Sequence, residues 1–170
     1  MVRLEFSRRY SMAHRLLSDP SGKCLTPHGH DELVSVTLRP LQPMDFGGSN
    51  MTAAFEHAKG RWHGWIDNAV DHAFQLSLAD PLLGYFREHE PDRLPRIMTF
   101  DGDPTTEALA IGFLRKLTAF LEADGLFAAE AVRVQETPTN ACSLTAADLA
   151  SIDWSPGAWA RRADDSLNDL

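Results

Sequence analysis

The chain has 170 residues and a mass of 18.9 kDa, which fits one domain better than two. Hydrophobic residues make up 44% and charged residues 24% of the chain, so a disordered, collagenous or coiled-coil protein is excluded. The formal net charge of −8 argues against a general nucleic-acid-binding protein, because such a protein presents a basic face to the phosphates.

The sequence predicts a cytoplasmic protein. The two cysteines are too few for the disulfide framework of a small secreted domain. Charged residues interrupt the N-terminal segment, so we expect no apolar signal core there. The apolar runs are far shorter than the roughly 20 residues that cross a bilayer, so we also expect no membrane-spanning segment.

The N-terminal half of the chain predicts two strands followed by two helices. Apolar residues alternate within 2–16, and β-branched residues are frequent at 33–38, as in strands. Apolar residues recur every three or four positions over 52–68, as on one face of a helix, and Asn50 is placed to cap it. A shorter helix is predicted at 80–89, which an Asp-Pro pair opens.

The C-terminal half predicts two more strands around a long helix. The strands are expected at 96–100 and 131–135, and the helix opens at 104–107 and runs to about 123, before a glycine stops it. The tail is expected to begin with a helical turn and then to become irregular, with residues 161–170 frayed or disordered. This order of elements indicates an α+β fold rather than a repeated βαβ unit.

Three histidines form the strongest candidate for a metal site. His28 and His30 are separated by one glycine on an extended segment, so both imidazoles point to the same side. His14, on the preceding strand, can complete the set, and three neutral imidazoles with an open position are a usual way to hold catalytic zinc. The alternative is three unrelated histidines on the surface or in the core.

A cysteine and an Asp-His pair are weaker candidates. Cys24 follows Lys23, whose positive charge favours a thiolate, but a small apolar residue in a turn is the more common role of a cysteine. Asp71 can fix the tautomer of His72 for proton transfer, although adjacent side chains do not always face each other.

A carboxylate and two threonines complete the candidates. Glu136 ends a predicted strand, where its carboxylate can accept two N–H donors from the amidine edge of a heterocycle, as it does from a guanidinium. An exposed acid at a strand end is the ordinary alternative. Thr105 and Thr106 are equally well explained as the N-terminal cap of the long helix.

The order and spacing of these motifs resemble the 6-pyruvoyltetrahydropterin synthase family. The resemblance covers residues 2–144, and its motifs are Ala13-His14-Arg15, Lys23-Cys24-x3-His28-Gly29-His30, Val70-Asp71-His72, Pro104-Thr105-Thr106-Glu107 and Val134-Gln135-Glu136-Thr137. The last motif continues to Ala141-Cys142, as in the branch that makes 6-carboxytetrahydropterin for queuosine biosynthesis. Each motif alone is weak, and their combination is specific.

The resemblance implies a tunnelling fold, in which a four-stranded antiparallel sheet carries two long helices on one face. Residues 1–145 would form this domain, and residues 146–170 a partly irregular C-terminal extension. The edges of such a sheet must be paired or covered, and assembly into a closed barrel pairs them. The resemblance further implies a homo-oligomer, a trimer or hexamer, with sites at the subunit interfaces.

The resemblance also assigns a role to each candidate residue. The ligands of a Zn2+ cofactor would be His14, His28 and His30. The catalytic residues would be Cys24 as general base and Asp71 with His72, from the next subunit, as the partnered proton donor. The substrate-binding residues would be Glu136, Thr105 and Thr106, which hold the pterin ring.

The implied substrate is 7,8-dihydroneopterin triphosphate. A lyase of the carboxy-forming branch converts it to 6-carboxy-5,6,7,8-tetrahydropterin and releases triphosphate and acetaldehyde. Two alternatives stay open: a 6-pyruvoyltetrahydropterin synthase, and a non-catalytic zinc-bearing protein that binds a pterin or purine. Lys23, Arg15 and Arg8 are candidates to bind the triphosphate on charge alone. The chain departs from the family pattern at Asp31-Glu32, where an Asn or Ser and an aromatic residue are common.

Overall fold

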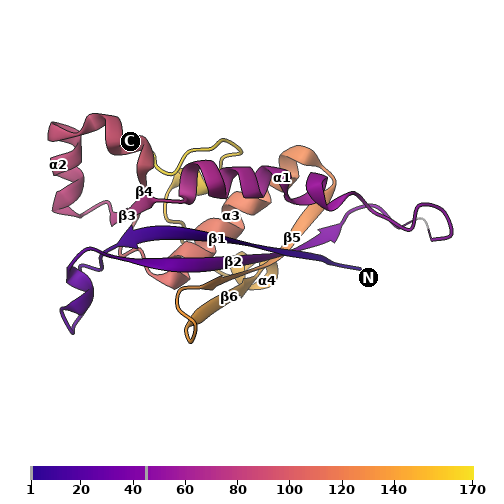
Figure 1. The fold of residues 1–170 in the computed structure, drawn as a ribbon, viewed down its shortest axis with the longest axis horizontal. Coiled ribbons are helices and arrows are strands. Elements are labelled where there is room, and N and C mark those ends of the chain that lie inside the picture. Colours follow the sequence, from indigo (N-terminus) through magenta and orange to yellow (C-terminus); the bar gives the residue numbers. More distant parts are fainter. Residues whose placement is uncertain (1, 45) are drawn as a thin grey trace.

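Within residues 2–44 and 46–170, which the computed structural model describes, the chain forms six strands and four α-helices (Figure 1). The strands are β1 (Leu4–His14), β2 (His28–Pro40), β3 (Ala73–Ser77), β4 (Ile97–Phe100), β5 (Phe127–Gln135) and β6 (Ala141–Thr145). The α-helices are α1 (Phe55–Trp65), α2 (Pro81–His89), α3 (Thr106–Asp124) and α4 (Ala146–Ala150). A π-helical turn, Ile66–Val70, extends α1.

The six strands belong to one sheet, in the spatial order β4-β3-β1-β2-β5-β6. Antiparallel pairs join β1, β2, β5 and β6. Three of these contain strands expected from the sequence, whereas β6 was not expected and the strand expected at 96–100 is β4. β3 and β4 continue the sheet beyond β1, and both pair in parallel. The expectation of four strands, all antiparallel, is therefore wrong: the described sheet is mixed and has six.

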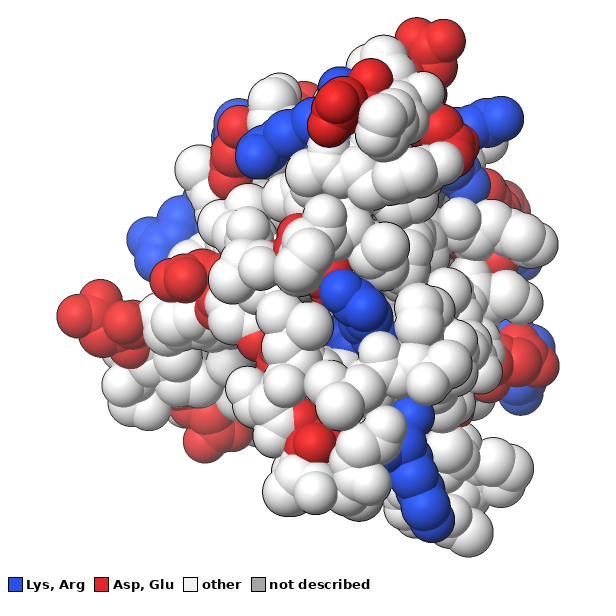
Figure 2. Space-filling view, turned by 90° about the vertical axis from the view of Figure 1, so that its left-hand side faces the viewer, with Lys and Arg blue, Asp and Glu red and all other residues white. Residues whose placement is uncertain are grey.

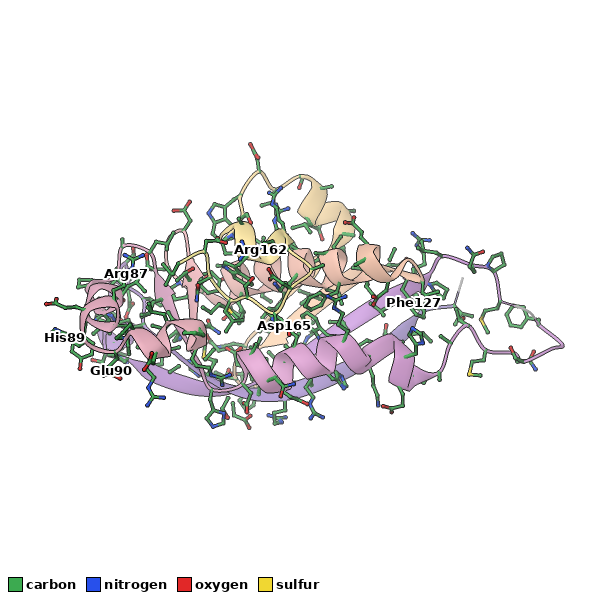
Figure 3. The ribbon with its side chains drawn as sticks, turned by 90° about the horizontal axis from the view of Figure 1, so that it is seen from above. Arg87, His89, Glu90, Phe127, Arg162 and Asp165 are labelled. Carbon is green, nitrogen blue, oxygen red and sulfur yellow. The ribbon has the colours of Figure 1, made fainter. Side chains whose placement is uncertain are left out.

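The two longest helices, α1 and α3, lie on one face of this sheet (Figures 1 and 3). The core lies between the layers, and alternate strand residues enter it, as Tyr10 and Met12 do on β1. Trp62 and Trp65 of α1 meet Phe113 of α3 edge to face, with ring centroids 5.6 Å apart in both pairs. Truncating one such ring to alanine typically costs about 3–5 kcal/mol, so this aromatic contact fixes the helices against the sheet.

The N-terminal helix ends agree with the predicted caps at two of three positions. Asp80 caps α2 by accepting a hydrogen bond from the Leu82 N–H, and Thr105 caps α3. Asn50 does not cap α1, because that helix begins at Phe55 behind Ala54, whose side chain makes no capping hydrogen bond. The predicted cap at Asn50 is therefore wrong.

The C-terminal tail is ordered and contributes to the core, which corrects the expectation of a frayed end. Trp159 is fully buried, and its indole N–H donates to the Thr99 carbonyl at 2.9 Å. The Nζ of Lys116, also buried, donates to the Trp159 carbonyl at 2.9 Å. The Leu167 carbonyl accepts the Thr99 N–H at 3.1 Å, so the tail covers the outer edge of β4. Figure 3 shows the segment with Arg162 and Asp165 beside the two long helices.

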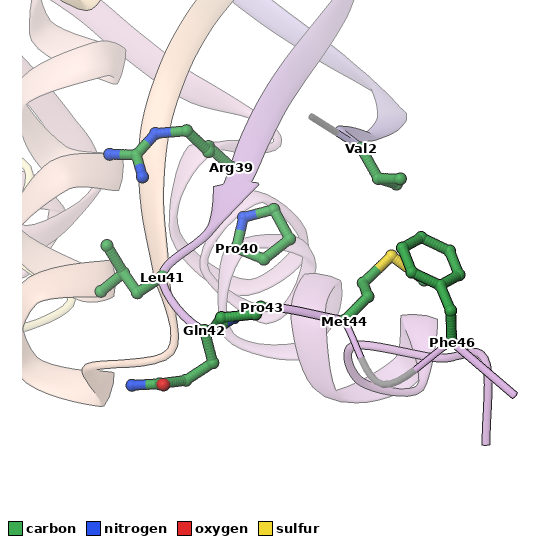
Figure 4. A pocket seen from close by; sticks show the side chains of 8 residues that line it. All are labelled: Val2, Arg39, Pro40, Leu41, Gln42, Pro43, Met44 and Phe46. Atoms are coloured by element: carbon green, nitrogen blue, oxygen red, sulfur yellow. The ribbon is translucent and has the colours of Figure 1, made fainter. Parts of the chain in front are cut away.

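A pocket of about 530 Å³ lies at the far end of β2, where Val2, Pro40, Met44 and Phe46 line it (Figure 4). β2 has 13 residues, so this pocket is roughly 40 Å along the strand from the histidines at its start. It is therefore separate from the candidate metal site.

The surface in Figure 2 carries acidic and basic side chains on the same face, without an extended basic field. Among the described helices, none has the length and apolar character needed to cross a bilayer.

Candidate functional site

The three candidate histidines converge at the loop end of the β1–β2 hairpin, where β1 ends and β2 begins. His14 ends β1 and lies directly opposite His28, the first residue of β2. His30 is two residues further along β2 and therefore on the same face. The ring centroids are 4.6–5.2 Å apart, and one nitrogen of each ring lies within 4.8 Å of the other two. The structure thus brings together the residues that the sequence marked as a metal site.

The hydrogen bonds of two rings show what this group is suited to bind. The Nδ1 of His14 lies 3.0 Å from the Pro104 carbonyl, and the Nδ1 of His28 lies 2.9 Å from the Thr26 carbonyl. A carbonyl only accepts, so each Nδ1 carries the proton and each neutral ring has its lone pair on Nε2. The two Nε2 atoms face each other at 3.1 Å. Such facing lone pairs need a positive partner, and a third imidazole beside them favours a metal ion over a single proton.

Gly29 permits this close pairing. A Cβ atom at this position would lie 2.5 Å from the Met12 carbonyl oxygen, which is far inside van der Waals contact. Any other residue would push β2 away from β1 and separate His14 from His28. The glycine between the histidines is therefore required by the backbone of the facing strand.

Glu136 lies beside the histidines at the end of β5. Its Oε1 accepts a hydrogen bond from the Thr106 hydroxyl at 2.9 Å and lies 4.0 Å from the Nε2 of His30. The Thr105 hydroxyl oxygen accepts a hydrogen bond from the Ala108 N–H at 3.3 Å and so caps α3. A pocket of about 480 Å³ opens along Glu136 and His30. Of the two threonines, only Thr106 is shown to contact the carboxylate.

Cys24 lies in a short 3-10 turn that folds back toward the end of β1. Its carbonyl accepts the Leu16 N–H at 2.8 Å, and its N–H donates to the Asp19 carboxylate at 2.7 Å. Burial raises the pKa of the Cys24 thiol, and the Asp19 and Glu136 carboxylates raise it further, whereas Lys23 lowers it. The expected effect of Lys23 is therefore present but outweighed by these groups.

Asp71 and His72 form a hydrogen-bonded dyad in the link between the π-helical turn and β3. The His72 Nδ1 lies 2.8 Å from Asp71 Oδ2, and Asp71 Oδ1 accepts the Ser11 N–H at 2.8 Å. The Ser11 hydrogen bond is the main reason that the pKa of Asp71 is lowered. Ser11 precedes His14 by three residues, so the dyad is attached to β1 about 10 Å from His14 along the strand. The dyad is not part of the three-histidine group that could hold a metal ion.

A family model described as 6-pyruvoyl tetrahydropterin synthase matches residues 3–147, most of the chain. The chain belongs to this family. A 6-carboxy-5,6,7,8-tetrahydropterin synthase from Aquifex aeolicus is 32% identical over 110 residues, which are 63% of this chain and 64% of the relative. A probable 6-carboxy-5,6,7,8-tetrahydropterin synthase from Halobacterium salinarum is 32% identical over 130 residues, 76% of this chain and 77% of the relative. The named relatives are synthases, so the family is one of enzymes.

Solved structures share the fold of this family. The 6-pyruvoyl tetrahydropterin synthase of Caenorhabditis elegans is similar with a TM-score of 0.57 and 26% identity, over 85% of this chain and 94% of that one. An uncharacterized protein from Wolinella succinogenes has a TM-score of 0.66 at 19% identity, over 86% of this chain and 99% of that one. The second likeness concerns the fold alone.

Two of the three basic residues proposed to bind triphosphate form ion pairs with carboxylates of the same chain. The Arg15 Nε donates to the fully buried carboxylate of Asp80 at 2.7 Å. Arg8 holds Asp67 through two hydrogen bonds of 2.6 and 2.7 Å. Their expected role as free anion-binding groups is not supported, and Lys23 alone of the three makes no ion pair within the described part of the chain.

A buried acid beside the site was not identified from the sequence. Glu32 is 1% exposed and accepts a hydrogen bond from the Tyr10 hydroxyl directly across the β1–β2 pair. Burial raises the pKa of Glu32 to about 7. The available signal was its spacing, because Glu32 lies two residues after His30 and so faces the same side of β2.

Proposed function

We propose that this chain is a zinc-dependent 6-carboxytetrahydropterin synthase. It would convert 7,8-dihydroneopterin triphosphate and one water molecule to 6-carboxy-5,6,7,8-tetrahydropterin, with release of triphosphate and acetaldehyde, in queuosine biosynthesis. The observation that carries the proposal is the pair of facing Nε2 lone pairs of His14 and His28, with His30 beside them. The carboxy-forming product is preferred because the curated relatives from Aquifex aeolicus and Halobacterium salinarum carry that name.

His14, His28 and His30 would hold the zinc ion. Their donor set fits it, because neutral imidazoles whose second nitrogen donates to a carbonyl are typical zinc ligands. A bound ion there supplies Lewis-acid stabilisation of negative charge on the side-chain oxygens of the substrate.

Glu136 would bind the pterin by accepting hydrogen bonds from its N–H edge. The Thr106 hydroxyl donates a hydrogen bond to this carboxylate at 2.9 Å, and because Glu136 lies 4.0 Å from His30, a pterin bound there would lie next to the metal ligands. Thr105 would contribute through the end of α3 that it caps. The ring is thereby held with its side chain directed toward the histidines.

Cys24 and the Asp71–His72 dyad would move the protons. Cys24 would take a proton from the substrate side chain next to the ring, and His72, held by Asp71, would return one to the pterin. Such a tautomerisation needs two groups in different electrostatic environments. Burial and the Asp19 and Glu136 carboxylates raise the pKa of Cys24, so its role as base would require the charge of a bound zinc ion to favour the thiolate.

A complete site would require a second copy of the chain. The side chain of His72 is 75% exposed, and the dyad is not part of the three-histidine group of its own chain, so a neighbouring subunit would supply it. We propose a cytoplasmic homo-oligomer, a trimer or hexamer, in which residues 1–145 form the pterin-synthase-like domain. Residues 146–170 would be an extension that completes the core through Trp159.

The experiment that tests this function is incubation of the zinc-loaded protein with 7,8-dihydroneopterin triphosphate. Mass spectrometry is expected to detect 6-carboxytetrahydropterin together with acetaldehyde, and chelation of the zinc is expected to stop both. A 6-pyruvoyltetrahydropterin product without acetaldehyde would replace the proposal by the sibling enzyme. Binding of the pterin without any product would replace it by the non-catalytic alternative.

A further inference from the structure

The turn that carries the Asp71–His72 dyad is held in an unfavourable backbone conformation. His72 has a φ of 65°, in the left-handed region that non-glycine residues rarely adopt. The turn follows the π-helical end of α1, where the Asp71 N–H donates to the Ile66 carbonyl at 2.8 Å. Both π turns and left-handed non-glycine residues cost free energy and persist only when the surroundings fix them.

Main-chain pairing with β1 accounts for part of this restraint. The His72 N–H donates to the Ser11 carbonyl at 2.7 Å, and the Ser11 N–H donates to the Asp71 carboxylate at 2.8 Å. These bonds hold the N–H of His72 and the side chain of Asp71. These bonds do not involve the carbonyl groups of Asn68 and Asp71, which need other partners.

Arg96 binds those carbonyl groups. It ends the 3-10 turn before β4, is half-buried, and donates from Nη1 to the Asn68 carbonyl at 2.6 Å. Its Nη2 donates to the Asp71 carbonyl. One guanidinium therefore joins two carbonyls three residues apart and ties the end of the π turn to the parallel strands β3 and β4.

We propose that Arg96 is a positioning residue for the Asp71–His72 dyad, acting through the backbone of the turn. The expected effect of Arg96 on turnover rests on the proposed function. The structural content of the inference, that the two hydrogen bonds of Arg96 fix the orientation of the His72 ring, does not depend on the reaction.

The other contacts of the turn do not replace Arg96. Arg8 holds Asp67 in the same turn, but both side chains are 40–45% exposed, and exposed ion pairs contribute little. The ring of His72 is largely exposed, and its recorded side-chain partner within the described chain is Asp71 alone. The orientation of the ring is thus set by Asp71 and by the backbone that carries both residues, which Arg96 binds at the Asp71 carbonyl.

Binding the Asn68 and Asp71 carbonyls together requires a guanidinium, and another cationic group would not serve. The planar fork of the guanidinium presents two N–H groups in a fixed relation, so both carbonyls are bound at once. A lysine at this position keeps the charge but supplies a single ammonium on a flexible stem. Arg96→Lys therefore separates the fork geometry from the charge.

The test compares Arg96→Lys with Arg93→Lys in the zinc-loaded, full-length protein. Arg93 belongs to the same 3-10 turn, but it is exposed and its ion-pair partner is Glu90, so it serves as the matched control. For Arg96→Lys, 15N NMR of His72 at fixed pH is expected to show a smaller share of the Nδ1–H tautomer that faces Asp71. We expect kcat to fall by about 100-fold, as for a small misplacement of a catalytic group, and KM to stay within about threefold. Zinc content is expected to remain at the wild-type level.

Two results would overturn the proposal. One is an unchanged His72 tautomer ratio in Arg96→Lys, and the other is an equal effect of Arg93→Lys. Because the NMR measurement needs no turnover, a wild-type protein without pterin synthase activity would refute the proposed function and leave the positioning role open to its own test.

Discussion

Replacing His28 by alanine is expected to remove the bound divalent ion and leave the fold intact. The Nε2 of His28 lies 3.1 Å from that of His14, so the variant loses one of the two facing lone pairs. Loss of an outer-shell partner typically lowers metal affinity about 10–100-fold, and loss of a ligand is expected to exceed this. Inductively coupled plasma mass spectrometry of the dialysed protein would measure the change in zinc per chain.

The matched control for this experiment is His89→Ala. His89 is the last residue of α2, where Figure 3 labels it, and it does not belong to the three-histidine group. Its side chain is 54% exposed. This variant is expected to retain the wild-type zinc content. Equal zinc content in His28→Ala and wild type would show that the histidines are not the ligands.

Replacing Cys24 by alanine is expected to abolish most turnover without loss of metal. A positioned general base contributes roughly 10²- to 10⁴-fold to the rate, and kcat is expected to fall within that range. The metal is expected to stay because its three candidate ligands are all imidazoles. Steady-state kinetics with 7,8-dihydroneopterin triphosphate, combined with zinc analysis of the same sample, gives both quantities.

Cys142→Ala is the control for the cysteine. Cys142 is the second free cysteine, lies on β6 opposite Val134 and is half-buried like Cys24. We expect turnover within about twofold of wild type, because a half-buried side chain outside the site loses only a small packing contribution. If Cys24→Ala retained wild-type turnover, the thiol would have no part in the proton transfer.

The sequence predicted the parts of the site that depend on local geometry. Residues two apart on a strand share a face, so His28 and His30 were expected to converge, and they do. The caps Asp80 and Thr105 follow equally local rules and are confirmed. The sequence could not show that Gly29 is required by the Met12 carbonyl, because that contact joins two strands.

The errors concern structure that depends on distant partners. β3 contains no β-branched residue, and its strand conformation comes from pairing with β1 and β4. The charged tail resembles a frayed end, but its order comes from Trp159 against α3 and from the Leu167 carbonyl at β4. Arg15 looked free for an anion because its partner, Asp80, lies 65 residues later.

The central claim is that three imidazoles, without a thiolate, hold one divalent cation. X-ray absorption spectroscopy at the zinc edge of the purified protein tests it directly. We expect a first shell of nitrogen and oxygen atoms at about 2.0–2.1 Å, with three imidazole contributions and no sulfur. A sulfur scatterer at about 2.3 Å, or a protein that binds no zinc at stoichiometric concentration, would contradict this account.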